Sequence, residues 1–261
     1  MTQANEAEIV ARLRAAGCVY AEAEAELLVS AAASPADLAD MVDRRAAGLP
    51  LEHVLGWAEF CGLRISVGPG VFVPRVRSEF LVAQAVAAAP HGRACVVVDL
   101  CCGSGAVGVA VATALGQAEL HACDIEPLAV ACARANVAAV GGTAYEGDLY
   151  DPLPSALRGR VDLVVVNAPY VPSSEIGLMP AEARLHEPRV ALDGGPDGVA
   201  IHRRVAAEAP CWLAPGGRLL IETSERQAPL TAAAITSAGL TATVISDHEM
   251  DATVVTGVSE N

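Results

Sequence analysis

The sequence contains no lysine and very few aromatic residues. Its 17 basic residues are all arginines and are outnumbered by 31 acidic residues, which gives a formal net charge of −14. Proteins that bind DNA or RNA usually carry a basic patch that neutralises phosphates, so this balance argues against a large nucleic-acid interface. Because aromatic residues make up 3% of the chain and hydrophobic residues 53%, we expect a sizeable core built mainly from Ala, Val and Leu.

The chain also lacks the signals that direct a protein to or across a membrane. The first ten residues, MTQANEAEIV, have neither the basic start nor the apolar stretch of a signal peptide. No apolar run reaches the roughly 18 residues needed to span a bilayer. We therefore expect a soluble, cytoplasmic protein that has no membrane partner.

Cysteines are frequent, but they lack the spacing of a metal site. The eight Cys residues form no CxxC pair and no Cys/His array, so no metal ion is predicted. In a reducing compartment they are expected to be small buried hydrophobic residues. A redox role for the vicinal pair Cys101-Cys102 stays open, although both lie in a turn that is also a candidate for ligand binding.

The first fifty residues predict a small helical domain, 1–50. Residues 3–48 are rich in Ala, with Glu and Arg at spaced positions and no run of β-branched residues. Ser34 followed by Pro35 fits a helix N-cap with proline at the first helical position. The sequence Gly48-Leu49-Pro50 is expected to end the segment.

Residues 51–75 change character and predict a β-hairpin linker. Short alternating stretches, Leu63 to Val67 and Val71 to Val73, flank the turn sequence Gly68-Pro69-Gly70. A helix is expected to begin at Ser78 and to continue to about Ala89.

The remainder, 76–261, alternates between strand and helix patterns. ACVVVDL is a continuous apolar run, as expected of a parallel strand that is covered on both faces. Two final apolar stretches lie too close together for a helix between them and should pair antiparallel. The pattern predicts a doubly wound α/β sheet with an antiparallel end. The expected strands are 94–100, 119–123, 161–166, 218–223, 242–246 and 253–257, and the expected helices between them begin at 105 and 127.

The first candidate site is the turn Cys101-Cys102-Gly103-Ser104-Gly105, between a buried strand and a helix. Gly103 and Gly105 allow a tight turn and a close approach of the backbone to a ligand. The N–H groups at the helix N-terminus can bind a carboxylate or phosphate. Alone this pattern is weak, because many strand-to-helix turns need glycine for steric reasons.

Two acidic residues strengthen the case for a nucleoside ligand. Asp124 ends the next strand, where a carboxylate can accept hydrogen bonds from both ribose hydroxyls, although it could instead cap the helix at Pro127. Asp148 follows the third strand-like stretch and could accept from an adenine amino group, with Leu149 packed on the ring. The other interpretation of Asp148 is a solvent-exposed turn residue. These residues do not distinguish NAD from S-adenosylmethionine.

The sequence Asn167-Ala168-Pro169-Tyr170 makes that distinction. It follows the strand VDLVVV and resembles the Asn-Pro-Pro-Tyr signature of amino- and amide-N-methyltransferases. An amide nitrogen is a poor nucleophile, and a pocket that accepts from both of its N–H groups fixes it and increases its electron density. The Asn167 side-chain oxygen and the Ala168 carbonyl can accept these bonds. Tyr170 can stack on the amide and face a sulfonium, a cation–π contact of ~0.5–2 kcal/mol.

With these motifs, the chain resembles the HemK/PrmC family, the protein glutamine-N5 methyltransferases that modify the Gly-Gly-Gln loop of peptide chain release factors. The resemblance runs from about residue 49 to the C-terminus. It is carried by three stretches: PLEHVLGWAEFCGLRISVGPGVFVPRVRSE, DLCCGSGAVGVAVA and LHEPRVALDGGPDGVAIHRR.

The resemblance implies a helical N-terminal domain that docks the substrate and a class I, Rossmann-like methyltransferase domain. It implies that S-adenosylmethionine contacts a first group of residues and that the target glutamine contacts a second. The first group is Cys101, Cys102, Gly103, Ser104, Gly105, Asp124, Asp148, Leu149 and Asn167. The second group is Asn167, Ala168, Pro169 and Tyr170.

The sequence departs from the family pattern in three places. Ala168 replaces the first proline of the signature, Val76 and Arg77 replace a usual Pro and Glu, and Cys101-Cys102 replace small residues beside Gly103. Three alternatives therefore stay open: an adenine-N6 methyltransferase acting on DNA or RNA, a small-molecule N-methyltransferase, and a pseudo-enzyme that binds S-adenosylmethionine without methyl transfer.

Overall fold

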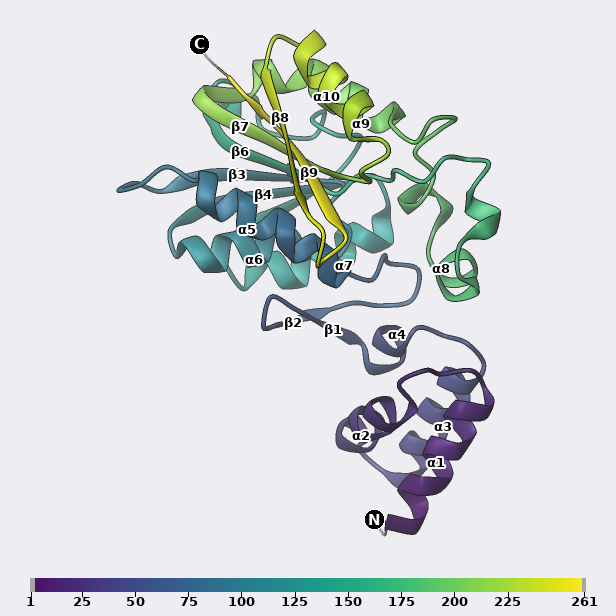
Figure 1. The fold of residues 1–261 in the computed structure, drawn as a ribbon. Helices are drawn as coiled ribbons and strands as arrows, with labels where there is room; N and C mark the ends of the chain where they lie inside the picture. Colours follow the sequence, from purple (N-terminus) through teal and green to yellow (C-terminus); the bar gives the residue numbers. More distant parts are fainter. Residues whose placement is uncertain (1–2, 260–261) are drawn as a thin grey trace.

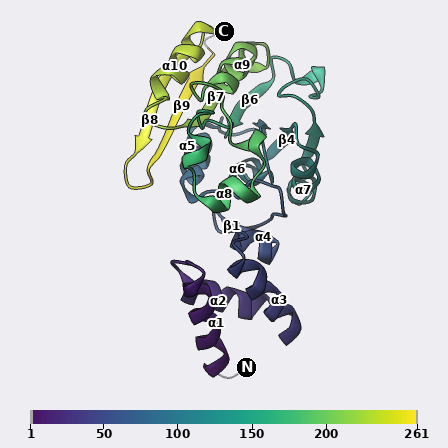
Figure 2. The same ribbon diagram turned by 90° about the vertical axis from the view of Figure 1, so that its right-hand side faces the viewer.

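The computed structural model describes residues 3–259, in which a helical N-terminal part is joined by a hairpin to a larger α/β part (Figure 1). Figure 2 shows the same arrangement from the side, with the N-terminal helices at one end of the molecule. Within residues 3–259, none of the helices is both long and apolar enough to cross a bilayer.

Four helices form the N-terminal part around a core of their own. Its largest fully buried side chains are Leu13 and Leu28. The predicted cap is confirmed: Ser34 Oγ accepts the backbone N–H of Asp37 at 3.2 Å, and Pro35 is the first helical residue. The helices are α1 (Gln3–Ala15), α2 (Ala21–Ala31), α3 (Pro35–Ala46) and α4 (Leu51–Leu55).

The hairpin lies earlier than the sequence predicts. Strands β1 (Trp57–Phe60) and β2 (Leu63–Ser66) pair antiparallel around a two-residue turn. Both turn residues are left-handed, Cys61 with φ 50° and Gly62 with φ 71°, which suits the right-handed twist of a hairpin. The expected hairpin around Gly68-Pro69-Gly70 is wrong, because a cysteine at positive φ gives no turn signal whereas Gly-Pro-Gly gives a strong one.

Seven strands form one sheet, in the order β5-β4-β3-β6-β7-β9-β8. The first five in this order pair in parallel, while β9 runs antiparallel to both β7 and β8. The predicted α/β sheet with an antiparallel end is therefore confirmed. The strands are β3 (Cys95–Leu100), β4 (Ala118–Asp124), β5 (Thr143–Glu146), β6 (Val161–Val166), β7 (Leu213–Thr223), β8 (Thr241–Asp247) and β9 (Ala252–Val258).

Helices cover both faces of the sheet (Figure 1). On one face α5 (Glu79–Ala88), α6 (Ala106–Leu115) and α7 (Pro127–Ala138) share a core with Val97, Leu163 and their neighbours. On the other face α9 (Ala200–Glu208) and α10 (Ala228–Ser237) pack on Val98, Val164 and Trp212. Because β3 and β6 are buried on both faces, their sequences are continuous apolar runs interrupted only by Asp99 and Asp162.

The strand order changes direction between β3 and β6. The strands that follow β3 in the chain, β4 and β5, lie on one side of this point, and β7 lies on the other side, next to β6. Loops that follow these strands diverge at their carboxyl ends and leave a crevice, the usual ligand position in such sheets. The long connection from β6 to α9, which contains α8 (Ala181–His186), extends from this edge toward the N-terminal helices (Figures 1 and 2).

Candidate active site

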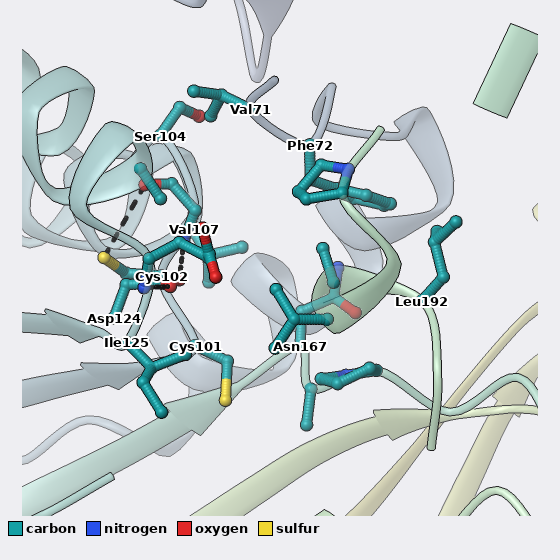
Figure 3. A pocket seen from close by; sticks show the side chains of 18 of the residues that line it. Val71, Phe72, Cys101, Cys102, Ser104, Val107, Asp124, Ile125, Asn167 and Leu192 are labelled. Carbon is teal, nitrogen blue, oxygen red and sulfur yellow. Dashed lines mark hydrogen bonds between the residues drawn. The ribbon is translucent and has the colours of Figure 1, made fainter. Parts of the chain in front are cut away.

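A cavity of about 190 Å³ lies at the carboxyl ends of β3, β4 and β6. In Figure 3, Cys102, Ser104 and Asp124 form one wall, and Phe72, Asn167 and Leu192 lie across from them. Gly105 does not line the cavity, whereas the other residues predicted from the sequence do. Those residues are Cys101, Cys102, Gly103, Ser104, Asp124, Asp148, Leu149, Asn167, Ala168, Pro169 and Tyr170.

The turn after β3 is built from residues with positive φ. Cys101 has φ 55°, Gly103 has φ 56° and Gly105 has φ 78°. A Cβ on Gly105 would lie 3.0 Å from Val137 Cγ2, so this glycine allows the start of α6 to pack against α7. Burial raises the pKa of the Cys101 and Cys102 thiols well above the usual value, so neither has the thiolate character that redox reactivity requires.

Asp124 holds the turn closed. Its Oδ2 accepts the backbone N–H of Gly103 at 2.8 Å, and its Oδ1 accepts the N–H of Glu126 at 2.9 Å. The side chain thus bonds the residue before α7 and does not cap the helix itself, whose N-cap position is Glu126. Burial raises the pKa of Asp124. The next residue, Ile125, also lines the cavity, and the sequence analysis did not identify it.

Asp148 and Leu149 also line the cavity. Asp148 Oδ2 accepts a hydrogen bond from Arg204 Nη2 at 2.7 Å, and Leu149 is buried with φ 48°. Arg204 comes from α9, and the two residues are 56 positions apart in the chain. At this separation, no local sequence pattern indicates the pair. The Arg204 guanidinium binds one of the two Asp148 carboxylate oxygens.

Asn167 and Tyr170 are held by contacts with side chains from other elements. Asn167 Nδ2 donates to Ser78 Oγ at 3.1 Å, which leaves the amide oxygen as the group able to accept from a substrate. Tyr170 Oη donates to Glu222 Oε1 at 3.4 Å, and the Arg77 guanidinium lies 5.8 Å from the centre of its ring. Burial raises the pKa of Tyr170, so the phenol is neutral at physiological pH.

The backbone of Tyr170 is fixed by Gln227, at the start of α10, and by two glycines in the segment that follows α8. Gln227 Nε2 donates to the Tyr170 carbonyl at 2.7 Å. A Cβ on Gly194 would lie 2.7 Å from Tyr170 Cα, and one on Gly198 would lie 2.4 Å from Tyr170 O. Only glycine fits at these two positions, which gives the LDGGPDG stretch a physical role: it holds the loop after β6 in place.

The segment before α5 also lines the cavity. It contributes Phe72 and Arg75, which the sequence motifs did not indicate. Glu187 Oε1 accepts the backbone N–H of Val73 at 3.1 Å and a hydrogen bond from Arg75 Nη2 at 2.6 Å. These bonds place Phe72 and Arg75 on the cavity wall. The sequence signal for this region was the similarity of the whole linker stretch, PLEHVLGWAEFCGLRISVGPGVFVPRVRSE, to the family.

Similarity to known proteins agrees with this geometry. The methyltransferase small domain matches residues 63–198. A release factor glutamine methyltransferase of Mycolicibacterium smegmatis is 39% identical over 211 residues, which cover 80% of this chain and 74% of that protein. The chain belongs to the release factor glutamine methyltransferase family. The resemblance inferred from the motifs is confirmed.

Other members and a solved structure extend this result. The family member from Geobacter sulfurreducens is 41% identical over 190 residues, which cover 72% of this chain but only 65% of that protein, slightly less than two thirds of its length. A methyltransferase from Pyrococcus furiosus shares the fold, with a TM-score of 0.56 at 15% identity over 76% of this chain and 89% of that chain. The class I methyltransferase fold predicted from the sequence is confirmed.

For this family the methyl donor is S-adenosylmethionine, and the cavity fits it. A largely buried carboxylate at Asp124 suits ribose hydroxyls, and the glycine turn allows close approach of the backbone. Ile125 and Leu149 add apolar side chains to the lining of the cavity.

Proposed function

We propose that this chain methylates the side-chain amide nitrogen of a glutamine in a release factor, with the Gly-Gly-Gln loop as target. The observation that carries the proposal is the position of Asn167, whose amide oxygen is left available in the cavity that Asp124 also lines. A target amide needs acceptors for both N–H groups, and the Ala168 carbonyl is the second candidate.

The bound cofactor supplies an electrophilic methyl group on a positively charged sulfonium. The chain has to orient the nitrogen and to withdraw it from water, and no strong base is required because the nitrogen becomes acidic once it is methylated. Asn167 and Ala168 would accept from the amide, while Tyr170 would stack against its plane. Catalysis then depends on positioning and fixed dipoles in a mostly apolar cavity.

Ala168 is compatible with this role despite replacing a proline. The residue is buried, and the accepting group is a backbone carbonyl that alanine shares. Pro169 restricts Ala168 to extended conformations, so the carbonyl direction is still limited. The same reasoning opposes the pseudo-enzyme alternative.

Exposed apolar side chains beside the cavity support a protein partner. Leu178 is 84% exposed and Val76 69%, and their chain neighbours Met179, Arg75 and Arg77 line the cavity. Large exposed apolar groups next to a site are typical of protein-binding surfaces, whereas a small-molecule enzyme has no need of them.

The deciding experiment is methyl transfer with labelled S-adenosylmethionine to a purified release factor, with the modified atom identified by mass spectrometry. We expect one methyl group on the loop glutamine and none on a release factor in which that glutamine is alanine. Leu178→Asp should lower transfer to the intact protein by roughly tenfold, the effect of a lost interface anchor, while cofactor binding is unchanged.

Two outcomes would contradict the proposal. Transfer to adenine in oligonucleotides without transfer to the release factor would favour the nucleic-acid alternative, and activity should then fall steeply with salt. Cofactor binding without transfer to any of these substrates would favour the pseudo-enzyme. A cytoplasmic location, where the chain would meet its substrate, belongs to the same proposal.

A further inference from the structure

A buried carboxylate joins two segments that line the cavity. Glu187, the residue directly after α8, is 6% exposed. Its Oε1 accepts both the backbone N–H of Val73, at 3.1 Å, and a hydrogen bond from Arg75 Nη2, at 2.6 Å. Its Oε2 is buried and has no hydrogen-bond partner within residues 3–259. A buried carboxylate with an unpaired oxygen is costly, so stability alone does not explain its presence.

The segment that Glu187 holds brings an aromatic ring to the cavity. Val71 and Val73 are buried in a small core against the hairpin and α7, whereas Phe72, between them, is only half-buried and lines the cavity. A Cβ on Gly103 would lie 4.0 Å from Phe72 Cβ, so Phe72 lies next to the turn after β3. In Figure 3 it lies across the cavity from Asp124.

The backbone is held on both sides of Phe72. Before it, His53 of α4 is buried, and its Nε2 lies 2.8 Å from the Val71 carbonyl oxygen. A carbonyl oxygen can only accept, so this nitrogen donates. After it, Glu187 accepts the N–H of Val73. The position of Phe72 therefore depends on two buried side chains from elements on either side of the segment.

Arg75 extends this hold to the ring itself. Its guanidinium carbon lies 4.9 Å from the centre of the Phe72 ring, while its Nη2 donates to Glu187. A guanidinium is attracted to the face of an aromatic ring, and a carboxylate that binds the guanidinium keeps it in place. Glu187 thus fixes both the backbone beside Phe72 and the cation on its ring.

We propose that Glu187 is a positioning residue for the methyl donor. Through Val73 and Arg75 it holds Phe72 beside the turn after β3 and so slows the release of bound S-adenosylmethionine. The inference goes beyond the proposed function and does not depend on the substrate, because the turn after β3 belongs to the cofactor side of the cavity.

The most direct test is cofactor binding to Glu187→Gln, which keeps the size of the side chain and removes the charge that binds Arg75. The Kd for S-adenosylmethionine should rise roughly tenfold, mostly through a faster dissociation rate, as is usual when the contacts around a bound ligand are weakened. Calorimetry gives the Kd, and stopped-flow displacement gives the rate. Arg75→Ala changes a partly exposed side chain and should have a similar effect, so the same contact is tested even where Glu187→Gln does not fold.

The matched control is Asp162→Asn. Asp162 is also a buried carboxylate that accepts one backbone N–H, from Val96, and binds one arginine, Arg93. It lies at the amino end of β6 and does not line the cavity. The control should lower stability and leave the Kd unchanged. An equal rise in Kd in the control, or a normal Kd in folded Glu187→Gln, would overturn the proposal.

A double variant shows whether Glu187 acts through Phe72. Phe72→Ala should raise the Kd at least as much as Glu187→Gln does, and adding Glu187→Gln to Phe72→Ala should change the Kd no further, because both substitutions disturb one contact. A general loss of structure would instead add to the effect of Phe72→Ala. Additive effects on the Kd would therefore overturn the positioning role.

Hydrogen exchange tests the contact without any ligand. In the full chain, the Val73 amide should exchange faster in Glu187→Ala than in the unsubstituted chain and should stay protected in Asp162→Asn. Unchanged exchange at Val73 in Glu187→Ala would overturn the proposal even if the chain methylates release factors. If all these results hold in a chain that does not methylate glutamine, the role of Glu187 is supported and the proposed substrate is rejected.

Discussion

The two ends of strand β6 differ in how their polar side chains are paired. At its amino end, Asp162 is 5% exposed and both of its oxygens accept from Arg93, with one bond of 2.8 Å. Its Oδ2 also accepts the backbone N–H of Val96 at 2.9 Å. At its carboxyl end, Asn167 donates through its amide nitrogen to Ser78. Within residues 3–259, neither the Asn167 amide oxygen nor Oε2 of Glu222, on the neighbouring strand β7, has a hydrogen-bond partner.

The difference separates stability from function. Buried polar groups normally have partners, because an unpaired group loses the hydrogen bonds that water would provide. The carboxylate oxygens of Asp162 are already hydrogen-bonded to other groups of the chain, so this side chain stabilises the fold. Groups that keep unused acceptors destabilise the folded chain, and a site that binds an amide needs such acceptors. The carboxyl end of the sheet is therefore where substitutions should change activity more than stability.

The largest effect is expected at Asn167. Asn167→Ala removes an acceptor aimed at the reacting nitrogen and should lower kcat about 100- to 1000-fold, as for other fixed transition-state contacts. Cofactor affinity and thermal stability should change little, because within residues 3–259 the side chain makes one hydrogen bond, to Ser78. Single-turnover kinetics with a release factor would measure this, and near-normal turnover would refute the assignment of Asn167.

Asp124 should come next and should affect binding. Asp124→Ala removes the carboxylate expected to meet the ribose and also frees the Gly103 N–H, so affinity for S-adenosylmethionine should fall by ~1.5–3 kcal/mol. Because burial raises the pKa of Asp124, affinity should decline on acidification earlier than for an ordinary aspartate. Calorimetry at several pH values tests both points. The assignment fails if a folded variant binds with normal affinity.

At the amino end of β6 the expected effect is on stability alone. Asp162→Asn removes a charge-assisted pair with Arg93 and should lower the free energy of unfolding by roughly 1–3 kcal/mol. Denaturant unfolding monitored beside the transfer assay would separate the two quantities. A clear loss of kcat in a folded Asp162→Asn chain would remove the distinction between the two ends of the strand.

The same contrast shows which features the sequence could predict. The span of β6, the Ser34 cap and the antiparallel end follow from local periodicity and turn chemistry. The hairpin was misplaced because its turn uses Cys61 at positive φ. The contact between Asn167 and Ser78 joins residues 89 positions apart, and tertiary pairing of this kind leaves no mark in a local pattern. The motif residues could therefore be predicted from the sequence, whereas the distant residues that contact them could not.

The smallest effect is expected from restoring proline at position 168. Ala168→Pro would reduce the conformational freedom of the unfolded chain. This should stabilise the protein by ~0.4–1 kcal/mol if the Ala168 carbonyl already points toward the position of the target amide. Turnover should then stay within about threefold of the starting value, since the accepting carbonyl is unchanged. Chemical denaturation and steady-state kinetics on the same preparation test this. A large gain in turnover would instead mean that alanine leaves the Ala168 carbonyl poorly directed, and that rigidity at the carboxyl end of β6 limits methyl transfer.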